Sequence, residues 1–265
     1  MKTAIKLVLI YFLMQLLGVL VAGPLCLAYT YLAEGVWNRG QAEAIALAPA
    51  MLMGFIFMGI YLWKNNYLTA DRHLYSPVSS SYLAWSLAAG ASSIFLIVAL
   101  MSCLTFLPDW LSDTFSLLQT GWLGILCIAV FGPVLEELLF RGAITKVLLK
   151  RYSPGKAILA SGLIFGLFHL NPVQVVGACF SGFLFAWIYY RTRSLIPGIL
   201  IHILNNSLAV WLGLNFKEAD TMAEVLGKPV YMIALAASVL LFFLSLKILN
   251  NYKLSDTNTT TITER

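Results

Sequence analysis

The chain has 265 residues, of which 60% are hydrophobic and only 11% are charged. An average soluble domain carries about a quarter charged residues, so this composition excludes a soluble globular protein and predicts an all-α, polytopic membrane protein. The net charge of +5 does not indicate nucleic-acid binding, because the basic residues form short clusters between apolar runs and not a patch with interleaved aromatic residues.

The apolar runs predict about eight transmembrane helices, since a spanning helix needs about 20 mostly apolar residues. The first run is longer than the roughly 7–15 apolar residues of a signal peptide, so we expect a retained helix. The fifth is the shortest and ends at Asn171-Pro172, which indicates a tight hairpin with the sixth. The predicted spans are residues 7–32, 44–63, 82–107, 117–140, 157–171, 173–190, 195–214 and 229–249.

The charged residues between the spans predict the orientation. With the N-terminus in the cytoplasm, most Lys and Arg residues fall on the inner side, which is the positive-inside pattern. We therefore expect an N-in/C-in protein of a bacterial cytoplasmic membrane. One helical membrane domain is predicted for residues 1–250, and a polar, disordered cytoplasmic tail for 251–265. His73 follows Arg72 in a charged loop, where we expect it to be solvated.

The four cysteines are scattered through apolar segments without a CxxC pair: Cys26, Cys103, Cys127 and Cys179. This pattern predicts small buried side chains and not metal ligands.

Five ionisable residues within the predicted spans or at their edges are singled out: Glu136, Glu137, Arg141, His169 and His202. A charged or ionisable side chain is costly in hydrocarbon, so such residues generally face the protein interior and mark a functional site. These five are the candidates for chemistry.

The stretch FGPVLEELLFRG, residues 131–142, contains three of these groups. Glu137 and Arg141 are four residues apart, the spacing at which a carboxylate and a guanidinium meet on a helix. Glu136 points about 100° away and remains available as a base, and Gly132-Pro133 is expected to loosen the helix before it. The alternative is that all three charged groups form a structural cluster.

Two further stretches contain polar pairs at helical spacing. FGLFHLNP, residues 165–172, places Phe165 and His169 on one face, and HILNN, residues 202–206, does the same for His202 and Asn206. Asn205 is rotated away and is expected to bond locally. Taken singly, each pair also fits a hydrogen-bonded core residue or a polar contact between helices.

Three spans that each bring such groups into the membrane predict one shared, water-accessible pocket. In one chemistry, Glu136 and His169 hold and deprotonate a water while His202 and Asn206 donate hydrogen bonds to an oxyanion. In the other, Glu136, His169 and His202 bind zinc as in a metallopeptidase. The usual HExxH zinc motif is absent from the chain, which favours a mechanism without a cofactor.

The three stretches resemble, in order, the EExxxR, FxxxH and HxxxN motifs of the CAAX-processing and bacteriocin-processing family of intramembrane proteases. This resemblance covers about residues 117–214, the expected catalytic core. It implies an intramembrane endopeptidase, favoured as a glutamate-type enzyme, whose site opens toward the cytoplasm. Glu136 would be the general base, and His169 would help to hold the water. His202 and Asn206 would stabilise the oxyanion, with Glu137, Arg141 and Phe165 in support.

The predicted spans place Glu136 near the inner end of the fourth helix and His169 near the outer end of the fifth. For both to share a site, the fifth helix must be short or tilted, or must end at mid-depth with Asn171-Pro172 as an internal turn. We expect the substrate to be a peptide or a lipidated protein at the membrane. Two alternatives are a non-catalytic scaffold or immunity-type protein that uses the polar cluster to bind a partner, and a proton-relaying transporter.

Overall fold

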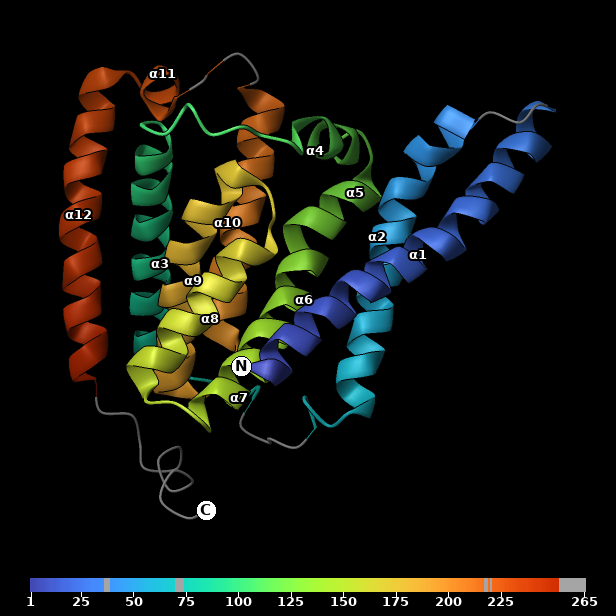
Figure 1. Cartoon of the computed structure of the whole chain (residues 1–265). Helices are drawn as coiled ribbons and strands as arrows, with labels where there is room; N and C mark the ends of the chain where they lie inside the picture. The colour runs from blue at the N-terminus through green and yellow to red at the C-terminus, as the bar shows by residue number, and fades with distance from the viewer. Residues whose placement is uncertain (36–38, 70–73, 217–218, 220, 253–265) are drawn as a thin grey trace.

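The structure, a computed structural model, describes residues 1–35, 39–69, 74–216, 219 and 221–252. Throughout these ranges the chain forms helices and turns without a β-strand (Figure 1), as the composition predicts. The elements in chain order are α1 (Lys2–Glu34), α2 (Arg39–Lys64), α3 (Ser80–Met101), α4 (Ser112–Leu118), α5 (Trp122–Leu126), η1 (Cys127–Phe131), α6 (Gly132–Leu139), η2 (Phe140–Thr145), α7 (Lys146–Leu149), α8 (Pro154–Phe168), α9 (Pro172–Thr192), α10 (Ile196–Asn215), α11 (Met222–Leu226) and α12 (Lys228–Asn251).

Seven helical segments of the described chain are long and apolar enough to cross a membrane, and α8 is an eighth, shorter apolar helix. The protein is therefore an integral, multi-pass membrane protein. Helix α8 has 15 residues and therefore a length of about 22 Å, which is less than the roughly 30 Å of a bilayer core. The prediction of a short fifth helix that ends before Asn171-Pro172 is confirmed.

The fourth span lies further along the chain than the sequence analysis placed it. It runs as one helical segment through α5, η1, α6, η2 and α7, over Trp122–Leu149, and not over 117–140. The predicted span stopped before Arg141 because a guanidinium ordinarily marks the end of an apolar run, whereas here the Arg141 charge is buried and paired. Glu136 consequently lies at the middle of the helix and not near its inner end.

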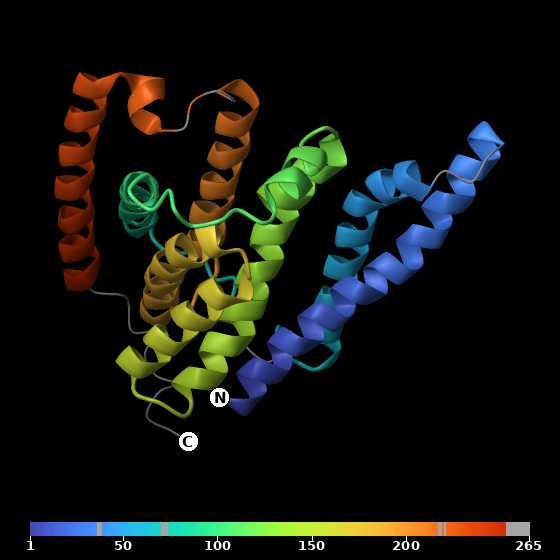
Figure 2. The same ribbon diagram turned by 45° about the horizontal axis from the view of Figure 1, so that its top comes forward.

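The helices form a central group between two flanking pairs. In Figures 1 and 2, α12 lies beside α3 on one flank, α6, α8, α9 and α10 occupy the middle, and the α1–α2 pair diverges on the other flank. The main buried core includes Phe140, Phe165 and Phe168, so residues of the fourth span and of α8 pack together at the centre.

The α8–α9 hairpin packs unusually closely. A Cβ atom added to Gly182 would lie 2.9 Å from Gly162 Cα, so the two backbones approach through paired glycines. Small residues allow this approach between helices in a membrane, where the hydrophobic effect does not drive association. The close packing brings the carbonyl of Gly182 to Arg141 and thereby positions part of the site.

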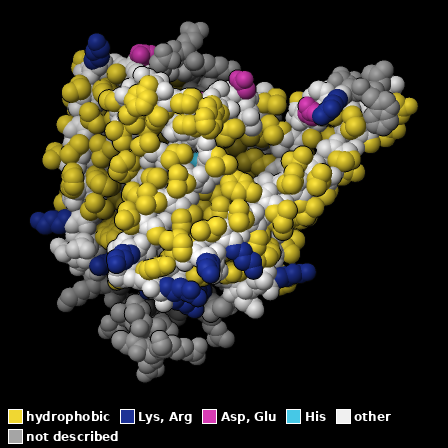
Figure 3. Space-filling view, viewed as in Figure 1, with side chains coloured by type: hydrophobic (Ala, Val, Ile, Leu, Met, Phe, Trp, Pro, Cys, Tyr) yellow, Lys and Arg dark blue, Asp and Glu magenta, His cyan; other side chains and the backbone are white. Residues whose placement is uncertain are grey.

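Charged side chains gather at the two ends of the helices (Figure 3). Lys and Arg side chains cluster at the end that holds α7 and the N-terminus, and Asp and Glu side chains lie at the opposite end. We call these the basic end and the acidic end. The described residues at the basic end include Lys2, Lys6, Lys64, Lys150, Arg151, Lys156, Arg191 and Arg193, and those at the acidic end include Glu43, Asp109, Asp113 and Glu224, with Arg39 and Lys228.

Two other expectations have different outcomes. Cys127 is buried, and Cys26 and Cys179 are partly buried, but Cys103 is exposed, so the prediction that all four cysteines are buried was wrong. Cys103 follows the last turn of α3, in a connection that the predicted span 82–107 had included. His73 and the predicted tail from residue 253 onward lie outside the described residues.

Candidate active site

The helix that carries the glutamates changes its hydrogen-bond pattern directly before them. The π-helix η1 ends at Phe131, and the N–H of the next residue, Gly132, donates to the carbonyl of Cys127 five residues earlier. The next donor in this register would be Pro133, which has no N–H, so the carbonyl of Ile128 lacks a backbone partner. Asn206 Nδ2 of α10 donates to this carbonyl over 2.9 Å. The Gly-Pro pair thus loosens the helix, as expected, and also ties α10 to it.

Glu137 and Arg141 form a buried ion pair, as their spacing predicts. Arg141 Nη1 lies 2.8 Å from Glu137 Oε1, and both side chains are almost completely buried. Arg141 Nη2 also donates to the carbonyl of Gly182 over 3.1 Å, and the guanidinium carbon lies 4.4 Å from the centre of the Phe165 ring. These contacts compensate a charge that would otherwise be very costly to bury, and they explain the supporting position of Phe165.

His202 is held by the same carboxylate. Its Nδ1 lies 3.1 Å from Glu137 Oε1, and because a carboxylate accepts hydrogen bonds, Nδ1 is the protonated nitrogen. This arrangement directs Nε2 toward Glu136, whose Oε2 is 3.7 Å away. Gly198, one turn earlier on α10, leaves room for the pair, since a Cβ atom there would lie 2.9 Å from Glu137 Oε2.

His169 approaches Glu136 from the end of α8. Its Nδ1 lies 2.9 Å from the carbonyl of Phe165, which accepts only, so this nitrogen is also protonated. Its Nε2 consequently presents a lone pair at 4.0 Å from Glu136 Oε2. The Glu136 oxygen itself is buried without a hydrogen-bond partner among the described residues, which is unusual for a buried carboxylate oxygen.

These groups share one cavity of about 460 Å³, a volume typical of a small-molecule or peptide side-chain site. Glu136, Phe165, His169, His202 and Asn206 all line it. In Figure 3 a histidine side chain is visible within the hydrophobic face of the molecule, and His169 is 20% exposed. The pocket expected from the three stretches is therefore present, in a geometry where polar groups from α6, α8 and α10 converge.

Several polar lining residues were not singled out from the sequence. Gln119, Gln174 and Ser181 line the cavity, as does Asn205, which donates to Asn206 Oδ1 over 2.9 Å as the expected local bond. Gln119, Gln174 and Ser181 carry no charge and therefore do not stand out among the ionisable groups of the spans. Their signal is a polar side chain within or beside an apolar helix, which alone does not separate a cavity residue from one at a helix interface.

The zinc alternative depends on Glu136, His169 and His202. Tetrahedral ligands at about 2.0–2.1 Å from zinc lie roughly 3.3 Å from one another, whereas the Glu136 oxygen is 4.0 Å and 3.7 Å from the two imidazole nitrogens. Within the described chain, no group of three or more His, Cys, Asp or Glu side chains is arranged to hold a metal ion. The three residues would have to move closer together to bind zinc.

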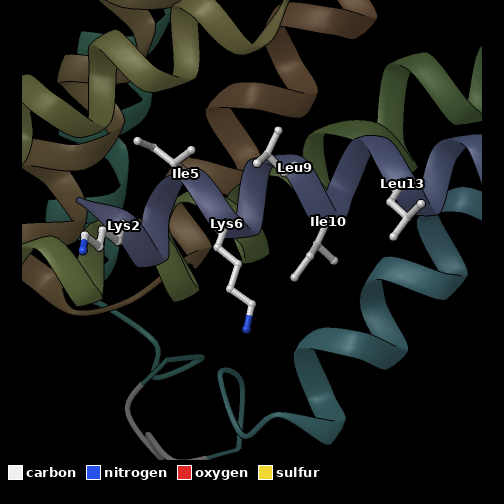
Figure 4. Close-up of a pocket in the computed structure, with 6 residues that line it drawn as sticks. All are labelled: Lys2, Ile5, Lys6, Leu9, Ile10 and Leu13. Atoms are coloured by element: carbon white, nitrogen blue, oxygen red, sulfur yellow. The ribbon is translucent and has the colours of Figure 1, made fainter.

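A second hollow lies on the surface of α1 and has a volume of about 400 Å³. Figure 4 shows its lining side chains projecting from this one helix to different sides. They are Lys2, Ile5, Lys6, Leu9, Ile10 and Leu13. It contains no carboxylate or imidazole, so it lacks the groups for hydrolysis.

Comparison with known proteins agrees with this site. A family model described as type II CAAX prenyl endopeptidase Rce1-like matches residues 118–208, a segment that contains every candidate site residue. This part of the chain is therefore similar to the type II CAAX prenyl endopeptidases. The Bacillus subtilis (strain 168) protein named "Putative membrane peptidase YdiL" is 32% identical to this chain over 98 residues.

That match covers 37% of this chain and 40% of the relative, so the chain matches less than half of the relative's length. No solved structure matches the chain. The similarity to this family thus lies in residues 118–208, the segment that also builds most of the cavity.

Proposed function

We propose that the protein is an intramembrane endopeptidase that hydrolyses a peptide bond of a membrane-associated protein or peptide in a bacterial cytoplasmic membrane. The observation that supports this most directly is the convergence of Glu136 Oε2 with the Nε2 atoms of His169 and His202 in one cavity. The family match and the name of the Bacillus relative support the same class of reaction.

Glu136 and His169 are proposed to activate the water. A separation of 4.0 Å is too long for a direct hydrogen bond, but a water about 2.8 Å from each atom would bridge them. His169 Nε2 accepts one of its hydrogen bonds, and Glu136 accepts the proton that leaves as the oxygen attacks the carbonyl carbon. Glu136 then returns that proton to the leaving amine.

His202 and Asn206 are proposed to stabilise the oxyanion. With Nδ1–H bonded to Glu137, His202 donates from Nε2 when both ring nitrogens carry a proton. Asn206 uses one N–H for the Ile128 carbonyl and retains a second for the substrate. Donors aimed at a developing negative charge contribute most in a water-poor site. The Glu137–Arg141 pair holds His202 in place, and the proposed steps need no metal.

Replacement of the proposed base tests the function. Cells with wild-type protein or the E136Q variant, at equal expression, are compared by mass spectrometry of membrane-derived peptides. A general base contributes about 10²–10⁴-fold, so the products should fall to background with E136Q. The control is E43Q, which removes an exposed carboxylate far from the cavity and should leave the products unchanged.

Two outcomes would contradict this proposal. Retained peptide products with E136Q would favour the alternative of a scaffold or immunity-type protein. Stoichiometric zinc in the purified protein, removed together with activity by a chelator, would replace the glutamate-only activation of water by a metal-dependent reaction.

A further inference from the structure

The cavity occupies only one half of the helical bundle. From α3 it is lined by Ile97, Val98 and Met101, all in the last turns of that helix, and from α9 it begins at Val173 and Gln174 in the first turn. Its deepest groups, Glu136 and His202, lie at mid-helix or close to it. None of the described connections at the basic end contributes a lining residue.

The half that contains the cavity is the one toward the acidic end. Asn171, directly after the α8–α9 turn, is 1% exposed, and its Nδ2 donates to Asp109 Oδ1 over 2.8 Å. Its Oδ1 accepts the N–H of Trp110 over 2.9 Å. These two bonds fix His169 against the connection between α3 and α4 at the acidic end. Met101, Phe115 and Gln119 line the cavity at this end, which we take as its mouth.

Lys and Arg residues mark the cytoplasmic side of a membrane protein, so the basic end with Lys64, Lys150 and Arg151 faces the cytoplasm. The segment at the mouth, residues 102–121, contains Asp109 and Asp113 but no Lys or Arg. An opening at this end lies beside these two carboxylates. Their negative charge disfavours an acidic peptide and admits a neutral or basic one.

We infer that the cavity opens to the outer side of the membrane and that its substrate is a neutral or basic peptide segment outside the cytoplasm, either an exported peptide or an outer juxtamembrane segment. This rests on the proposed peptidase function and differs from the cytoplasmic opening that the family resemblance implies. A prenylated protein on the cytoplasmic leaflet meets the basic end, where the cavity has no lining.

Cysteine labelling tests the side of the mouth without relying on catalysis. The full chain, with Cys26, Cys127 and Cys179 replaced by Ser, retains the exposed Cys103 as a native reporter of the acidic end. Two further chains lack all four native cysteines. One carries Q174C in the cavity, and the other carries Y152C at the basic end, where Tyr152 is 39% exposed. Intact cells are treated with a sulfonated, membrane-impermeant maleimide.

We expect Cys103 and Q174C to be labelled in intact cells, and Y152C only after permeabilisation. Labelling of Q174C only after permeabilisation, or not at all, would overturn the outward opening. Labelling of Y152C but not Cys103 in intact cells would overturn the orientation on which the inference depends.

The cleavage products provide the second readout. Bonds cut by the wild type but not by E136Q should lie in segments outside the cytoplasm. Cuts in cytoplasmic segments would overturn the inference and leave the peptidase function intact. If no cut depends on Glu136, the peptidase function fails and the products contradict the substrate assignment, while the labelling still decides the side of the mouth.

Discussion

Arg141 is the charge on which the geometry of the site depends. It is fully buried and makes a 2.8 Å bond to Glu137, whose Oε1 atom also accepts from His202. A displaced Glu137 would therefore displace the imidazole that faces Glu136. Arg141 is absent from the residues that line the cavity, so we expect it to act by positioning these groups.

The variant R141M keeps a long apolar side chain but leaves Glu137 as an uncompensated buried charge. Loss of one partner of a buried pair costs about 3–5 kcal/mol, so the thermal midpoint in detergent should fall sharply. The double variant E137Q/R141M should recover part of this loss, because it removes both charges. The matched control is R39M, which breaks the exposed pair with Glu43 at the same spacing. An unchanged midpoint for R141M would contradict the positioning role.

At the level of single residues, the sequence predicted what local spacing determines. The Glu137–Arg141 pair and the availability of Glu136 both follow from helical geometry along one helix. The bond of His202 to Glu137 could not be predicted from spacing, because these residues are 65 positions apart. The local sequence of each segment does not indicate which helices pack against each other. The capture of the Ile128 carbonyl by Asn206 was hidden for the same reason.

The turn between α8 and α9 is the element that places His169. Leu170 adopts a positive φ of 56°, a conformation that non-glycine residues rarely adopt, and Asn171 directly follows it. The two side-chain bonds of Asn171, to Asp109 and to the N–H of Trp110, hold this turn. The hairpin therefore depends on a segment more than 60 residues away along the chain.

Substitution of Asn171 tests this dependence. N171D places a second carboxylate against Asp109, so we expect His169 to shift and peptide cleavage to fall by up to roughly 100-fold. The double variant D109N/N171D restores an amide–carboxylate pair with the roles exchanged and should recover most of the activity. N215A, which removes an exposed amide bonded only to its own helix, is the control. No recovery in the double variant would show that the pair does not position the turn.

At the level of elements, the short helix α8 was predicted from the requirement that His169 and Glu136 meet. The end of the fourth span was not, since the predicted span stopped before the guanidinium of Arg141. Neutralisation of Arg141 by Glu137, Gly182 and Phe165 depends on partners from two other helices. Tertiary contacts thus decided where that helix ends.

In the described part of the molecule, basic side chains gather at one end and acidic side chains at the other (Figure 3), and the cavity that contains Glu136, His169 and His202 reaches toward the acidic end. The orientation of the chain therefore determines which compartment supplies the substrate. Three long helices precede α4, so an N-in chain places Gln119 outside the cytoplasm and returns to the cytoplasm at Tyr152 after the next span.

Reporter fusions measure this orientation directly. Alkaline phosphatase fused after Gln119 should be active, because the enzyme folds only outside the cytoplasm, and the same fusion after Tyr152 should be inactive. Green fluorescent protein at these positions should give the opposite pattern, with fluorescence only after Tyr152. Immunoblots of each fusion control for expression. A reversed pattern would place the acidic end and the cavity mouth in the cytoplasm, where prenylated proteins would again be candidate substrates, so this measurement decides between the two substrate classes.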